Sequence, residues 1–260
     1  MAKPRSMRER RGWAFATAVA ILKPTLLATT RHEWVDGEKL PADGGAVIAA
    51  NHVSHLDPLT FAHFVYDHGR LPRYLAKASL FEIPVAGAIV RSTGQIPVHR
   101  MSTSASQAFD SAVQAVQEGK IVIVYPEGTL TRDPDLWPMV GKTGAAGIAL
   151  SAGVPVVPVA QWGAQEILYP YAKKPDLVPR KVIHIKAGDP VDLDDLRGQP
   201  VTPAILHRAT DRIMHDITRL LEDVRGETAP AERFDPKRAG VRAIGNPHEV
   251  ERKQRRRRSR

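Results

Sequence analysis

The sequence of 260 residues contains no cysteine. Disulfide bonds, thiolate metal sites and a cysteine nucleophile are therefore excluded, although the absence does not settle the compartment. Aromatic residues make up only 6% of the chain, which is few for a protein that stacks nucleic-acid bases on its surface. The apolar stretch between Gly12 and Thr30 is too short to cross a bilayer, because Lys23-Pro24 interrupts it and a spanning helix needs about 20 apolar residues.

The net charge of +9 is concentrated at the two ends of the chain. Residues 1–11 contain five Lys or Arg and one Glu, residues 251–260 contain seven and one, and the chain between them carries about −1. Two basic tails around a nearly neutral middle would be attracted to a polyanion, either an anionic lipid surface or RNA. The charge therefore does not by itself indicate nucleic-acid binding.

The N-terminal apolar stretch predicts two short helices hinged at Pro24. Arg8, Arg10 and Arg11 precede it and could reach phosphate head groups. This pattern favours a helical segment that lies in the membrane interface, whereas the alternative is a helix packed on the core of the domain. We expect residues 1–34 to form this segment, residues 35–225 to form a catalytic domain, and residues 226–260, which are polar and end in Arg255–Arg258, to be a disordered basic tail.

Downstream, short β-rich runs alternate with helical patterns, which predicts a single α/β domain with a largely parallel or mixed central sheet flanked by helices. With 43% hydrophobic residues, the chain can bury one substantial core. The expected strands are Ala46–Ala50, Tyr74–Lys77, Gln95–Val98, Ile121–Tyr125, Val156–Ala160 and Val182–Lys186. The expected helices are Leu59–His68, Val85–Arg91, Thr103–Glu118, Thr143–Ala152 and a longer one from Pro203 to about Val224.

The first expected strand is followed by a polar loop, NHVSHLD, that contains His52, Ser54 and Asp57. On a regular helix a spacing of five would separate His52 and Asp57 by about 140°, so they meet only if His52 stays in the loop. Asp57 then suits the N-cap before Pro58, and Ser54 with Asp57 is a rival capping box. A carboxylate that orients an imidazole would leave its other nitrogen as a base. Alternatively, Asp57 only caps the helix and His52 fills a polar loop.

Two further clusters follow expected strands. GQIPVHR contains Arg100, which could hold a phosphate through two parallel hydrogen bonds. YPEGTLTR contains Gly128, which permits close backbone approach, and Thr129 and Arg132, which supply donors. Lys142 follows in a glycine-flanked loop, so the region could hold an anion.

Taken in order, NHVSHLD, GQIPVHR, YPEGTLTR and VPVVPV resemble the four motifs of the glycerolipid acyltransferases typified by 1-acylglycerol-3-phosphate acyltransferase. The resemblance covers roughly residues 35 to 200. It implies transfer of a fatty acyl group from acyl-CoA, or an acyl carrier protein, to the hydroxyl of a lysophospholipid in phospholipid biosynthesis. The first and third motifs are the most specific.

The resemblance also implies residue roles. His52 would be the general base and Asp57 its orienting partner, while Arg100 would bind the phosphate of the acceptor. Glu127 and Gly128 match the third motif, with Glu127 assisting acceptor binding or holding the loop. Many members carry Arg where this sequence has Leu130, so Arg132 and Lys142 become the candidate substitutes, with Thr129 beside them.

The expected partners are the lysophospholipid acceptor, the acyl-CoA donor and an anionic membrane surface, with no specific nucleic acid. The resemblance implies a peripheral or monotopic position on the cytoplasmic face of the cell membrane. We expect no cofactor and no metal, because a thioester is already reactive and the sequence shows no convincing ligand set. Oligomeric state has no signature in the sequence.

Two alternatives remain open from the residues. Ser54 could act as a nucleophile beside His52 in an ester or thioester hydrolase, although the Gly-x-Ser-x-Gly surroundings of a nucleophile elbow are missing. The Arg-rich tail could instead be the working part of a nucleic-acid-binding protein, but the nearly neutral middle of the chain argues against this.

Overall fold

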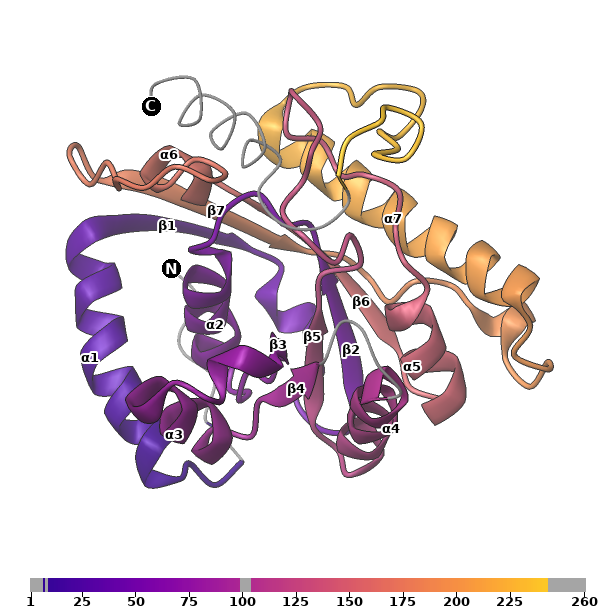
Figure 1. Ribbon diagram of the computed structural model, residues 1–260, viewed down its shortest axis with the longest axis horizontal. Helices are drawn as coiled ribbons and strands as arrows, with labels where there is room; N and C mark the ends of the chain where they lie inside the picture. Colours follow the sequence, from indigo (N-terminus) through magenta and orange to yellow (C-terminus); the bar gives the residue numbers. More distant parts are fainter. Residues whose placement is uncertain (1–6, 8, 99–103, 243–260) are drawn as a thin grey trace, which may run out of the picture.

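The computed structural model describes residue 7, residues 9–98 and residues 104–242 (Figure 1). Its centre is a five-stranded mixed sheet in the order β1-β7-β6-β2-β5. The strands are β1 (Thr30–Val35), β2 (Ala46–Ala50), β5 (Ile121–Val124), β6 (Val156–Trp162) and β7 (Lys181–Ala187). The helices are α1 (Trp13–Thr29), α2 (Asp57–Asp67), α3 (Pro84–Ser92), α4 (Ser104–Gln117), α5 (Gly144–Ala152), α6 (Ala164–Ile167) and α7 (Pro203–Arg225). The predicted α/β domain with a mixed central sheet is confirmed.

The two central strands are buried on both faces. Val47 and Ala49 of β2 point toward α4, α5 and α7, whereas Ala46, Ile48 and Ala50 point toward α2. Side chains alternate between the faces of a strand, so an apolar run of this kind needs a helical layer on each side. The helices therefore cover both faces of the sheet (Figure 1).

Strand direction brings several connections to one edge of the sheet. β2, β5 and β6 run parallel, whereas β7 runs antiparallel to β6 and parallel to β1. The carboxyl ends of β2, β5 and β6 therefore lie at the same edge as the starts of β7 and β1. Because Thr30 pairs with Lys181, the C-terminal end of α1 also arrives at this edge. We call it the carboxyl edge of the sheet.

A second, two-stranded sheet lies beyond β5. It consists of β3 (Leu75–Lys77) and β4 (Ile96–Val98), which are parallel. A parallel bridge between Tyr74 and Ile123 joins it to β5, so β3 and β4 extend the main sheet in the same direction. The strands expected at Tyr74–Lys77 and Gln95–Val98 are thus confirmed with slightly shorter bounds.

The N-terminal segment differs from the expectation. The helix α1 continues through Pro24, so the prediction of two helices hinged there is wrong. A proline removes one backbone donor, and Lys23 holds the helix at this point through an ion pair of 2.6 Å with Asp67 of α2. Residues 30–34 belong to β1, so the expected boundary between residues 34 and 35 cuts through a strand of the central sheet. Within the described ranges, no helix combines the length and apolar character that a membrane span requires.

The C-terminal segment also differs from the expectation. Residues 226–242 pack against the domain: the amide of Val140 donates to the carbonyl of Phe234, and the amide of Ala229 donates to Glu222 of α7. The prediction of disorder from residue 226 is therefore wrong for this stretch, in which Ala229 packs against the cluster around Trp137. Residues 243–260, with the arginine-rich end, lie outside the described residues.

Candidate active site

His52 and Asp57 meet at the carboxyl edge of the sheet. β2 ends at Ala50, the loop carries His52, and α2 begins at Asp57, so the chain turns back on itself between the two residues. Nδ1 of His52 lies 2.8 Å from Oδ2 of Asp57. The Asp57 side chain is fully buried, whereas 15% of the His52 side chain is exposed. The structure thus brings together the pair that the spacing predicts.

Asp57 fixes the loop as well as the ring. Its Oδ2 accepts hydrogen bonds from the backbone amides of Val53, at 2.6 Å, and Ser54, at 2.8 Å. The helix cap differs from the expectation, because Leu56 is the N-cap and Asp57 is already helical. The expected Asp57 N-cap therefore does not form. Half of the rival capping box is present, because Asp57 accepts from the amide of Ser54, whereas the Ser54 hydroxyl oxygen accepts from the amide of Leu56 and not from that of Asp57.

The contact with Asp57 involves only one of the two ring nitrogens of His52. A carboxylate only accepts hydrogen bonds, so the contact with Asp57 assigns the proton to Nδ1 and leaves Nε2 as an acceptor. The imidazole also stacks on the ring of Tyr125, with centroids 4.1 Å apart and planes inclined by 13°. Sequence reasoning did not find Tyr125 as a site residue. The only signal was its position at the end of a strand, directly before Pro126-Glu127-Gly128.

Glu127 holds the backbone of the loop that carries His52. Its two oxygens accept hydrogen bonds from the amides of His52 and Met139, each at 3.0 Å. The side chain is 2% exposed, and burial raises the pKa of Glu127 to about 8. Of the two roles that the resemblance implied, this geometry fits holding the loop.

Backbone pairing continues beyond the ends of the strands. The amide of Thr131 donates to the carbonyl of His52 at 2.8 Å. The side chain of Asn51 both donates to and accepts from the backbone of Gln161, and the Gln161 side chain donates to the carbonyl of Asn51. These contacts extend the β2 and β6 pairing to the residue before His52, so His52 follows a backbone that is hydrogen-bonded to β6.

The remaining predicted residues lie in the segment after β5. Gly128 adopts a positive φ of 70°. The Lys142 side chain passes so close that a Cβ added at Gly128 would lie 2.6 Å from Nζ of Lys142. Thr129 is partly exposed beside them. Arg132 is buried, its guanidinium lies 4.7 Å from the ring centroid of Tyr171, and desolvation lowers its pKa. Arg100 lies outside the described residues.

Ser54 is held in a structural role. It is fully buried, its hydroxyl donates to the carbonyl of Leu168 at 2.7 Å, and the hydroxyl oxygen accepts from the amide of Leu56. A nucleophile needs a hydroxyl directed at the base, and this one is directed at a carbonyl of another loop. The geometry disfavours the hydrolase alternative.

A known family matches the part of the chain that forms this site. The family described as Acyltransferase matches residues 32–162, which is about half of the chain. The chain belongs to the acyltransferase family. This confirms the resemblance that the ordered motifs indicated. The match contains every predicted site residue of this acyltransferase chain, whereas β7, α7 and the C-terminal segment lie beyond it.

Relatives agree with this assignment. The chain is 35% identical over 133 residues to 1-acyl-sn-glycerol-3-phosphate acyltransferase BAT2, chloroplastic, of Brassica napus, covering 50% of this chain and 37% of that protein. It is 34% identical over 123 residues to the 1-acyl-sn-glycerol-3-phosphate acyltransferase of Borreliella burgdorferi, covering 47% of each. The corresponding Bacillus subtilis protein is 35% identical over 129 residues, with 48% and 60% covered. The matches therefore cover between 37% and 60% of the length of these curated relatives.

A solved structure shares the fold of this acyltransferase chain. The crystal structure of the 1-acyl-sn-glycerophosphate (LPA) acyltransferase PlsC from Thermotoga maritima superposes with a TM-score of 0.61. The two sequences are 21% identical, and the match covers 83% of this chain and 81% of the other. The shared architecture therefore reaches well beyond the family match and includes most of the chain.

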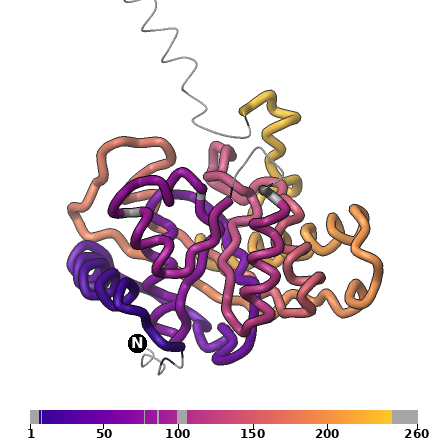
Figure 2. The backbone as a smooth tube through the Cα atoms, turned by 60° about the horizontal axis from the view of Figure 1, so that its bottom comes forward, coloured from indigo at the N-terminus to yellow at the C-terminus, as the bar shows by residue number. Residues whose placement is uncertain are grey.

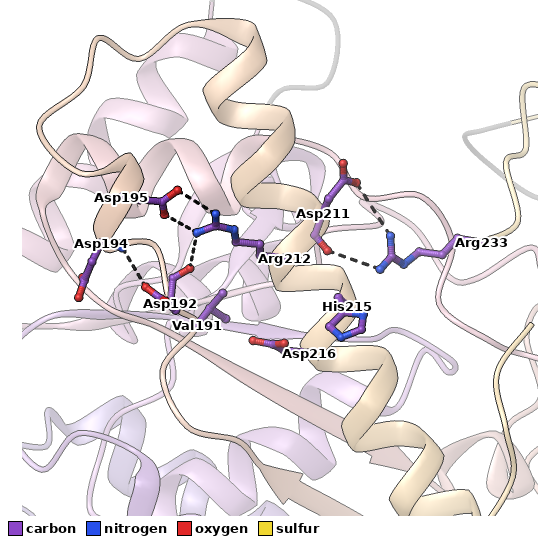
Figure 3. Close-up of a pocket in the computed structure, with 9 residues that line it drawn as sticks. All are labelled: Val191, Asp192, Asp194, Asp195, Asp211, Arg212, His215, Asp216 and Arg233. Atoms are coloured by element: carbon purple, nitrogen blue, oxygen red, sulfur yellow. Dashed lines mark hydrogen bonds and ion pairs between the residues drawn. The ribbon is translucent and has the colours of Figure 1, made fainter. Parts of the chain in front are cut away.

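A separate hollow lies beside α7, away from the predicted site. It has a volume of about 720 Å³ and is lined by Asp192, Asp194, Asp195, Asp211, Asp216, Arg212, Arg233, His215 and Val191 (Figure 3). Arg212 binds Asp195, and Arg233 lies 3.9 Å from Asp211, so several of its charges are paired. None of the predicted site residues of the acyltransferase chain lines it.

Proposed function

We propose that this acyltransferase transfers a fatty acyl group from acyl-CoA, or from an acyl carrier protein, to the free hydroxyl of 1-acylglycerol-3-phosphate. The observation that carries the proposal is the 2.8 Å contact between His52 Nδ1 and Asp57, which leaves Nε2 free to act as a base. The names of the relatives support the choice of acceptor. The product would be a diacylated glycerol phosphate, so the reaction belongs to phospholipid biosynthesis.

The proposed reaction is a direct attack. Nε2 of His52 takes the proton from the acceptor hydroxyl while the oxygen attacks the thioester carbonyl. A carbon–oxygen bond forms, the carbon–sulfur bond breaks, and the thiolate of the donor leaves and takes up a proton. Asp57 stabilises the imidazolium that forms in between, as an orienting carboxylate does in other His–Asp pairs. We propose that no cofactor takes part, since the thioester carbonyl is already reactive.

Basic side chains after β4 and β5 would bind the phosphate of the acceptor. Arg132 and Lys142 lie on the segment that also contacts the His52 loop, and Arg100 follows β4, which runs parallel to β3 and ends in the same direction as β5. An arginine can bind a phosphate through two parallel hydrogen bonds. Thr129 would add a hydroxyl to this phosphate-binding group, and Gly128 would let the phosphate approach the backbone closely. Glu127 would hold the backbone of the loop through the amides of His52 and Met139.

The helix α1 would keep the enzyme at the surface of a membrane. Only Ala14 and Phe15 of this apolar helix are buried, whereas Trp13, Ile21 and Leu27 are exposed. An apolar helix that is too short to span and is flanked by arginines suits the interface of an anionic bilayer. We propose a peripheral or monotopic position on the cytoplasmic face, with α1 ending at the carboxyl edge where the lipid acceptor would enter.

The test is acyl transfer by purified protein with labelled acyl-CoA and a panel of lysolipids, with products identified by mass. The substitution His52→Ala should reduce transfer by about 10³-fold or more, whereas Ser54→Ala should retain much of it. Loss of transfer in Ser54→Ala together with a trappable acyl-serine in the wild-type protein would overturn the proposal. Removal of residues 243–260 should leave acyl transfer intact. Loss of transfer in the truncated protein, together with specific RNA binding by the full-length protein, would favour the nucleic-acid alternative.

A further inference from the structure

The loop between α6 and β7 exposes apolar side chains that the fold does not use. In residues 168–180, Tyr169 is 55% exposed, Leu177 is 42% exposed and Val178 is 83% exposed. Single apolar residues on a surface are ordinary, but three in one short loop form a patch. We call residues 169–178 the α6–β7 loop tip.

The charges beside this patch are positive. Lys173 and Lys174 are exposed, and neither has an ion-pair partner among the described residues. The acid of the same loop, Asp176, binds Lys181 at 3.0 Å, so it does not neutralise the two lysines. An apolar tip with adjacent unpaired lysines complements an anionic lipid surface, where each basic residue adds attraction.

The loop lies beside the C-terminal end of α1. A guanidinium nitrogen of Arg180 donates to the carbonyl of Leu27 at 2.6 Å and also to that of Thr30. Figures 1 and 2 both show the loop next to this end of the helix. Ile21, Leu22 and Leu27 are exposed on the same part of α1. Both elements therefore expose apolar side chains near the carboxyl edge of the sheet.

The other end of the loop is attached to the active site. The carbonyl of Leu168 accepts the hydroxyl proton of Ser54, which lies in the loop that carries His52. Tyr171 stacks on the guanidinium of Arg132 and meets His55 edge to face, with ring centroids 5.8 Å apart. A contact made by the tip is thus only a few residues from the groups proposed to bind the acceptor.

We propose that the α6–β7 loop tip is a second membrane-contacting element, which inserts Tyr169, Leu177 and Val178 among anionic lipid head groups beside α1. Tyrosine suits the interface because one end of its side chain is apolar and the other is polar. Contact through both elements orients the carboxyl edge toward the lipid that supplies the acceptor. This inference rests on the proposed function, which makes the substrate a membrane lipid.

The test compares the partition of full-length variants onto phosphatidylcholine vesicles with and without phosphatidylglycerol, measured by flotation. The double substitution Leu177→Asp, Val178→Asp should lower the partition coefficient about tenfold. The matched control is Val35→Asp, Val201→Asp, which adds the same charge at two exposed positions outside the loop and should partition like wild type. Lys173→Glu, Lys174→Glu should weaken the preference for phosphatidylglycerol, which the basic ends of the chain would still support in part.

Transfer assays separate this inference from the proposed function. The loop variants should lose transfer to an acceptor held in vesicles but retain it with a short-chain, water-soluble acceptor. If wild type transfers to neither acceptor, the proposed reaction fails, and a tenfold partition difference would still support the loop as a lipid contact. Partition equal to wild type in both loop variants would overturn the inference. So would a transfer defect restricted to acyl carrier protein as donor, which would make the loop a protein-docking surface.

Discussion

The ring of Tyr125 lies flat against the imidazole of His52, 4.1 Å between centroids. The neighbouring strands β2 and β5 position the two rings, because each residue follows the carboxyl end of one of them. Stacking restricts rotation of the imidazole, so its Nδ1 stays on Asp57 and its Nε2 keeps one direction. The aromatic face therefore acts as a second group that orients the His52 ring.

We expect Tyr125→Leu to lower kcat about fivefold, because aromatic stacking contributes roughly 1 kcal/mol to holding the imidazole in place. Tyr125→Phe keeps the stacked face and should retain most of the rate. Steady-state kinetics with a soluble acceptor checks this. Equal loss in both variants would show that the hydroxyl, and not the stacking, is what matters.

Asp57→Ala should destabilise the fold by about 3 kcal/mol in addition to stopping transfer, because the buried amides of Val53 and Ser54 would lose their acceptor. His52→Ala should cost only about 1 kcal/mol, since the ring is partly exposed and holds no backbone group. Urea unfolding of the two variants measures the difference. Similar stabilities would contradict the loop-fixing role of Asp57.

Glu127 should make the stability of the protein depend on pH. Its pKa rises from 4.5 to about 8 on folding through burial, so the folded state binds the proton more tightly than the unfolded state. The stabilising contribution is complete below pH 4.5 and is lost as the pH rises through about 8. The free energy of unfolding of wild type should therefore fall over this window relative to Glu127→Gln.

Urea unfolding at several pH values across that window tests the Glu127 prediction. Glu166→Gln, at an exposed position of α6, controls for the removal of one carboxyl group. A wild-type slope that survives unchanged in Glu127→Gln would place the titrating group elsewhere.

Arg225 should be a stabilising residue at the end of α7. Its guanidinium lies 3.9 Å from the ring centroid of Trp137 and 4.3 Å from that of Trp162, and it donates to the carbonyl of Asp135. We expect Arg225→Ala to cost about 3 kcal/mol, because a desolvated cation–π contact contributes about 2 kcal/mol and one hydrogen bond is lost as well.

Thermal or urea unfolding checks the Arg225 prediction, with Arg219→Ala as control because that side chain lies on the same helix and is mostly exposed. Arg225→Lys keeps the charge but loses the planar face, so it should recover only part of the loss. Full recovery with lysine would show that charge alone suffices.

Local patterns predicted the elements that are buried on both faces or strongly periodic. The apolar runs of β2 and β5 and the long helix α7 were assigned close to their observed bounds, since burial and capping residues act within a few positions. The strand β1 was missed because TRHEWV carries charged residues at its second and fourth positions. It also lies at the edge of the sheet, where the sequence of a strand is a weaker guide to its structure. The short helix α6 was missed for lack of length.

The site was predictable only where its contacts are close in the sequence. The spacing of His52 and Asp57 indicated their pairing, because the loop between them is short. The hydrogen bond from His52 to Glu127 and the stacking on Tyr125 depend on the adjacency of β2 and β5, which no local pattern determines. The packing of residues 226–242 likewise depends on tertiary contacts, those of Ala229 with α7 and of Phe234 with Val140.

The reversal of direction between β6 and β7 has a consequence for how this fold can diversify. Residues 163–180 leave and re-enter the sheet at the same side, so they make a return excursion and need not cross the domain. The pairing of β6 with β7 therefore does not fix how many residues this connection must contain. Exchange of residues 172–178 alone between homologous chains, with the contacts of Leu168 and Tyr171 left in place, should alter how the protein meets a surface while the His52–Asp57 contact stays intact.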